Sequence, residues 1–149
     1  MRPEREGRIG RLCMPSPIEV QFFFSIRSRY SYLASTQIER LERETGARIV
    51  WRCLASAELM AASGYRPFEG TATSGQYEWP YRQQDAEAWA DYYGVPYREP
   101  PAPMADASLS KRACVAAERM GAAAPYARRL FARYFTEGRD PLAAPELAA

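Results

Sequence analysis

Two serines, Ser28 and Ser31, are the residues whose type and spacing point most directly to chemistry. They follow an apolar run that ends at Phe24 and open a segment with helical periodicity, so we expect both at a helix N-terminus. Backbone N–H groups are unpaired there, and the helix dipole favours negative charge. A serine hydroxyl can donate a hydrogen bond to a thiolate but cannot form a disulfide. The pair therefore predicts a site that binds the thiol of another molecule.

The composition excludes several other kinds of site. The chain has no histidine, which rules out Ser-His-Asp and Cys-His mechanisms and removes the commonest metal ligand. Cys13, Cys53 and Cys114 include no Cys-x-x-Cys pair, so dithiol redox chemistry and a zinc site are disfavoured and we assign no metal. We expect free thiols in a reducing cytosol, with Cys53 in the core.

Length and charge suit a soluble globular protein of 149 residues, 47% hydrophobic and 26% charged. A net charge of +2 gives no reason to expect a nucleic-acid partner or an acidic membrane surface. No apolar run is long enough to cross a bilayer. We therefore expect a cytoplasmic protein with a small-molecule substrate, and we leave the oligomeric state open between a monomer and a homodimer.

The periodicity of the first third predicts a βαβ unit over residues 18–54. Residues 18–24 are β-prone and almost wholly apolar, which favours a central strand covered on both faces. A helix should follow over 29–45, with Ser28 as N-cap and Gly46 at its C-terminal end. Residues 48–54 alternate as a second strand, and this strand–helix–strand length predicts a parallel pair.

From residue 55 onward the pattern becomes helical. We predict helices over 55–62, 80–93, 108–120 and 125–137, and we divide the chain into a disordered extension (1–17), the βαβ unit (18–54), a helical insertion (55–140) and a tail (141–149). Two strands leave an open sheet edge. We therefore expect that the chain is incomplete or that a partner completes the sheet.

Three segments in order resemble the thioredoxin-like family that includes 2-hydroxychromene-2-carboxylate isomerase, kappa-class glutathione transferase and the disulfide oxidoreductase DsbA. They are FFFSIRSRYSYLA (22–34), YRQQDAEAWADYYGVPY (81–97) and LFARYFTEGRD (130–140). In this family the two serines occupy the place of the Cys-x-x-Cys pair. The resemblance implies an α/β fold, with a thioredoxin-like βαβ unit followed by an all-helical insertion domain. From the resemblance we also expect this sequence to lack the family's C-terminal ββα part, with its cis-proline loop.

The resemblance also implies a site and an activity. Ser28 corresponds to the catalytic serine that contacts glutathione, and the implied glutathione-binding set is Ser28, Arg29, Tyr30, Ser31 and Tyr65. Glutathione would serve as cofactor, its thiolate adding to an aromatic conjugated keto acid so that a double bond can rotate before the thiolate leaves. The implied enzyme is an isomerase of aromatic catabolism, similar to 2-hydroxychromene-2-carboxylate isomerase, or a glutathione transferase-like protein.

Other interpretations of the same residues stay open. Ser28 could be an ordinary N-cap, and Arg27 and Arg29 could grip carboxylates of glutathione or substrate, or be solvated charges in a turn. Arg29 also replaces the proline that usually follows the serine in relatives, and Tyr65 lies near the position of their glutathione-holding asparagine. The alternative function is a non-catalytic thioredoxin-like binding module or a truncated gene product.

Overall fold

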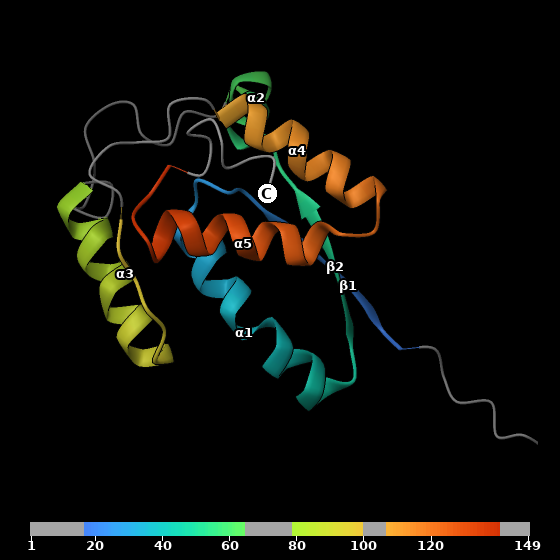
Figure 1. Cartoon of the computed structure of the whole chain (residues 1–149), viewed down its shortest axis with the longest axis horizontal. Coiled ribbons are helices and arrows are strands. Elements are labelled where there is room, and N and C mark those ends of the chain that lie inside the picture. The colour runs from blue at the N-terminus through green and yellow to red at the C-terminus, as the bar shows by residue number, and fades with distance from the viewer. Residues whose placement is uncertain (1–16, 65–78, 100–106, 141–149) are drawn as a thin grey trace, which may run out of the picture.

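Two parallel strands and five helices make up the computed structural model over the residues that it describes, 17–64, 79–99 and 107–140. The elements are β1 (Glu19–Phe24), α1 (Arg29–Thr45), β2 (Arg48–Cys53), α2 (Ser56–Ser63), α3 (Trp79–Tyr93), α4 (Ala107–Arg119) and α5 (Ala123–Phe135), as Figure 1 labels them. The tail, Tyr65 and nearly all of the predicted extension lie outside the described residues.

The predicted βαβ unit is confirmed. β1 and β2 pair in parallel, from Glu19 opposite Arg48 to Phe24 opposite Cys53. Ser28 is extended (φ −93°, ψ 115°) and caps α1, as its place before the helical segment predicts. Gly46 ends α1 with a φ of 69°, a left-handed conformation that glycine adopts without steric cost.

Aromatic side chains join the βαβ unit to the later helices. Phe24 of β1 lies 5.5 Å from Trp51 of β2 and 5.8 Å from Phe131 of α5, measured between ring centroids. Tyr32 of α1 stacks on Phe135 of α5 at 5.4 Å. The core is therefore continuous across the boundary that we predicted at residue 54.

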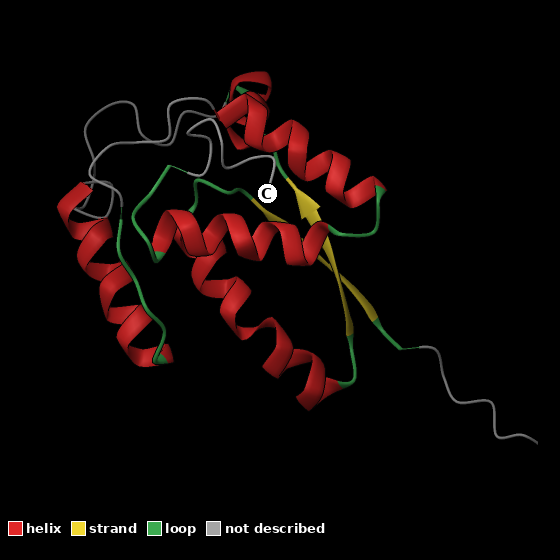
Figure 2. Ribbon diagram, in the orientation of Figure 1, coloured by secondary structure: helices red, strands yellow, loops and turns green. Residues whose placement is uncertain are grey.

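The helices take up distinct positions around the two strands. α5 contacts α1, α4 and β2, whereas α4 packs against both β2 and α5. α3 contacts α1 and lies at the end of the molecule farthest from the strands (Figure 2). α1, whose first turn carries the two serines, therefore contacts both α3 and α5.

The prediction that β1 is covered on both faces is wrong. Phe24 is 2% exposed, but Phe23, which points to the opposite face, is 54% exposed. Among the described residues only β2 pairs with β1. The apolar run correctly predicted that these residues form a strand. It could not predict which faces of the strand are covered, because that depends on how the rest of the chain packs.

Candidate functional site

Ser28 lies in the turn between β1 and α1, and both its backbone and its side chain make hydrogen bonds there. Its N–H donates to the Ser25 carbonyl at 3.0 Å, and its own carbonyl accepts from the Tyr32 N–H at 3.0 Å. The Ser28 hydroxyl oxygen accepts from the Ser31 N–H at 3.2 Å. Because this bond uses a lone pair of the oxygen, the hydroxyl hydrogen is left to donate to another group. Ser28 is half-buried at the N-terminus of a 17-residue helix.

Three further serines surround this turn. The Ser31 hydroxyl accepts from the Ser25 N–H at 3.3 Å, which ties the first turn of α1 to the end of β1. The Ser56 hydroxyl, at the start of α2, donates to the Ser25 hydroxyl at 3.4 Å. The carboxyl ends of both parallel strands therefore meet in a polar cluster, the usual place for ligands in α/β sheets. Ser56 was not predicted as part of the site, although its position just after the predicted second strand was a signal.

Arg29 is buried rather than solvated. Its Nε lies 2.8 Å from Glu99 Oε1 and its Nη2 donates to Glu99 Oε2 at 3.2 Å, with side-chain exposures of 5% and 10%. This two-point contact is the arrangement that guanidinium and carboxylate groups favour. The interpretation of Arg29 as a solvated turn charge is wrong, and the carboxylate that it grips belongs to Glu99 of the same chain. Its assignment to glutathione stays a prediction.

Two tyrosines extend the polar contacts toward the helical segment. Tyr97 donates to Glu99, and burial together with that bond raises the pKa of Tyr97 far above its ordinary value. Tyr30 donates to Asp85 of α3 at 2.7 Å. Partial burial is the larger cause, and this hydrogen bond the second, of a raised pKa of Tyr30. Both phenols are therefore held protonated, as donors to carboxylates. Neither Tyr97 nor Glu99 was predicted as part of the site, although Tyr97 ends the second segment that resembles the family, and Glu99 lies two residues beyond it.

The structure brings part of the predicted site together. Ser28, Arg29, Tyr30 and Ser31 share the first turn of α1, whereas Tyr65 lies outside the described residues. Arg27 is exposed beside Ser28 and is the cation of this turn that faces solvent. Among the described residues no group of acidic, cysteine or histidine side chains could hold a metal ion, and no helix is long and apolar enough to cross a membrane.

Comparison with known proteins identifies the class to which this fold and turn belong. A family model described as a DSBA-like thioredoxin domain matches residues 19–149, and the chain belongs to this family. The resemblance found in the three sequence segments is thereby confirmed, and so is the predicted fold class.

One solved structure gives a nearer comparison. A selenomethionine 2-hydroxychromene-2-carboxylate isomerase superposes with a TM-score of 0.66 and 24% sequence identity over 83% of this chain. The chain spans 59% of the length of that isomerase chain. At this identity the match shows a shared fold. A comparison with curated protein sequences gave no significant match.

Proposed function

We propose that this chain is a glutathione-dependent isomerase-like protein that acts on an aromatic conjugated keto acid. The observation that carries the proposal is the Ser28 hydroxyl, which caps α1 at the place where this family binds or forms reactive thiols, with no cysteine in the same turn. The isomerase with the same fold supports the choice of reaction.

The first turn of α1 suits a bound thiolate. A helix N-terminus lowers the pKa of a nearby thiol because its dipole and N–H groups stabilise the negative charge. Ser28 would hold this thiolate through its remaining hydroxyl hydrogen, and Ser31 would fix the turn through its bond from Ser25. When bound, glutathione would supply a thiolate that adds reversibly to a conjugated double bond and so permits cis–trans rotation.

Arg27 is the residue that we propose for anionic groups of glutathione or substrate. Its side chain is exposed next to Ser28, whereas the charge of Arg29 is matched internally by Glu99. A guanidinium group binds carboxylates well because it offers several N–H donors in one plane. The two arginines of the turn therefore take different roles, one facing the ligand and one holding the scaffold.

A capping-neutral substitution separates a binding role of Ser28 from a purely structural one. Ser28→Asp keeps an N-cap acceptor, so stability should stay within about 0.5 kcal/mol, but the carboxylate cannot donate and repels a thiolate. Ser28→Ala should lose about 1 kcal/mol of stability. Both variants should lower the glutathione-dependent rate by about 10²-fold, the effect of removing one preorganised donor, whereas Ser31→Ala should lower it much less.

The assay follows the absorbance of an o-hydroxybenzylidenepyruvate-type substrate with and without glutathione, beside calorimetric titration of glutathione into the purified chain. Wild-type turnover that needs no thiol, or full glutathione binding by Ser28→Asp, would contradict the proposal. A stable chain that neither binds glutathione nor isomerises the substrate would favour the non-catalytic binding module instead.

A further inference from the structure

The fold brings together two thiols that the sequence keeps far apart. Cys53 is the last residue of β2 and Cys114 lies in the middle of α4, which packs against β2, so that both side chains belong to one core cluster and interact with each other. Both are free cysteines, Cys53 half-buried and Cys114 only 2% exposed. The spacing rule that excluded a Cys-x-x-Cys site does not apply to a pair formed by packing.

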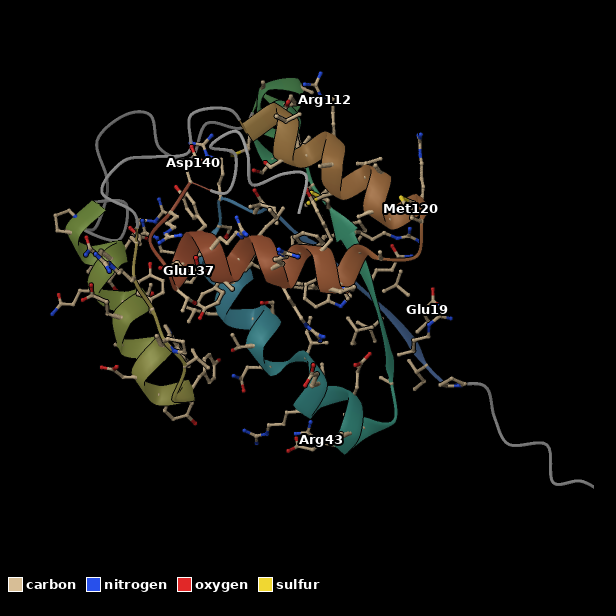
Figure 3. The ribbon with its side chains drawn as sticks, viewed as in Figure 1. Glu19, Arg43, Arg112, Met120, Glu137 and Asp140 are labelled. Carbon is tan, nitrogen blue, oxygen red and sulfur yellow. The ribbon has the colours of Figure 1, made fainter. Side chains whose placement is uncertain are left out.

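Ion pairs on each side of the two thiols hold α4 against β2 and α2. Lys111, one turn before Cys114, pairs with Glu58 of α2. Glu118, one turn after Cys114, pairs with Arg52, the neighbour of Cys53. Figure 3 labels Arg112 on α4 and Met120 just after its C-terminal end, and α4 packs against β2. The contact between the thiols is therefore fixed by the packing of three elements.

The two cysteines differ in pKa and in exposure. These differences suit Cys53 as the thiolate that is oxidised first and Cys114 as the resolving thiol, which attacks the oxidised sulfur to form a disulfide. The hydrogen bond from Cys114, assisted by the charge of Lys111, lowers the pKa of Cys53 despite partial burial. The same bond, together with burial, raises the pKa of Cys114. Cys53 is also the more exposed of the two. An oxidant from solvent should therefore react with Cys53 first, while Cys114 stays buried and protonated.

We propose that Cys53 and Cys114 are a redox modification site, which closes to a reversible intramolecular disulfide when the protein meets a peroxide. The Cys53 thiolate attacks one peroxide oxygen, the O–O bond breaks, and the leaving oxygen takes a proton to become water. Cys114 then attacks the sulfenic sulfur, and its proton leaves with the oxygen as a second water. Two thiols are oxidised to one disulfide, and one hydrogen peroxide is reduced to two waters.

The bond would close a loop of about 60 residues between β2 and α4, which restricts the unfolded chain. We expect the melting temperature to rise by about 5–10 °C on oxidation. Cys53 stands opposite Phe24, directly before Ser25 of the serine cluster. The disulfide would therefore fix the strand end that carries the candidate site.

A chain with Cys13→Ser leaves the two relevant thiols and tests the proposal directly. After hydrogen peroxide treatment, maleimide labelling should show both thiols lost together, and non-reducing peptide mass spectrometry should find Cys53 joined to Cys114 within one monomer. Dithiothreitol should restore both thiols and the original melting temperature. Two thiols that still label, or a Cys53 that stops at sulfinic acid, would overturn the proposal.

Two controls separate proximity in the fold from general thiol chemistry. The native chain should form the disulfide at least about 10-fold faster than the same chain in concentrated urea, because unfolding lets the thiols separate; equal rates would refute the proposal. With Cys114→Ser added, Cys53 should be trapped by dimedone as a sulfenic acid, and absence of the adduct from a folded variant would count against Cys53 as the attacking thiolate.

Discussion

The buried pair of Arg29 and Glu99 offers the sharpest test of the packing around the candidate site. Glu99→Gln keeps the shape of the side chain and one oxygen acceptor but removes its charge. The Arg29 guanidinium, with its side chain 5% exposed, would then lose the negative charge of Glu99. Tyr97 would also exchange a charged acceptor for a neutral one.

The size of the effect follows from burial. Removing one partner of a buried ion pair costs about 3–5 kcal/mol, because the remaining charge stays out of water. The glutamine oxygen can still accept a hydrogen bond, which returns about 1 kcal/mol. We therefore expect Glu99→Gln to reduce the free energy of unfolding by about 2–4 kcal/mol, a large part of the stability of a small domain.

Urea unfolding followed by tryptophan fluorescence measures this change, because Trp51 is buried in the core. Arg40 and Glu44 give a matched control, since they pair at 2.7 Å with side chains 66% and 59% exposed. Glu44→Gln should cost less than about 0.5 kcal/mol. The double variant Arg29→Met with Glu99→Gln should recover much of the loss. If Glu99→Gln costs no more than Glu44→Gln, the reasoning is refuted.

Alkaline pH and the two faces of β1 give two further tests. Burial and the bond to Glu99 hold the pKa of Tyr97 in the folded chain far above its ordinary value of about 10. Above about pH 10 the unfolded chain loses this proton while the folded chain keeps it. The free energy of unfolding should therefore fall as pH rises. Thermal melts should show that Tyr97→Phe lessens this fall; an unchanged slope would contradict the assignment. Phe24→Ala should cost about 3–5 kcal/mol and Phe23→Ala less than about 1 kcal/mol in urea unfolding, because only Phe24 is buried. Similar losses would mean that both faces of β1 are covered.

Local signals in the sequence were enough to predict the βαβ unit and the turn that carries Ser28. The apolar run before Ser25, the cap at Ser28 and the glycine at position 46 each report on a few neighbouring residues. The structure shows the strand, the cap and the left-handed glycine at these places. The four later helices also begin and end within about two residues of the predicted bounds, since their limits depend on local periodicity.

Contacts between distant residues could not be predicted in the same way. The burial of Arg29 depends on Glu99, which lies 70 positions later in a segment without periodicity. The contact of Cys53 with Cys114 depends on how α4 packs against β2. The sequence left Arg29 open between a turn charge and a group that binds carboxylates of a ligand, and it predicted Cys53 as a core thiol. Neither prediction could name the partner inside the chain, because tertiary structure decides which distant residues meet.

The one-sided pairing of β1 has a consequence for how its backbone meets solvent. The carbonyl of Ile18 accepts from the N–H of Arg48 in β2, and that of Phe24 accepts from Leu54, directly after β2. The even-numbered residues of β1 therefore direct their amide groups toward β2. The amides of Glu19, Gln21 and Phe23 therefore point to the open edge, where no described strand pairs with them. Their amide protons should exchange with deuterated water quickly, while those of Val20 and Phe22 exchange slowly, so that protection alternates along a single strand.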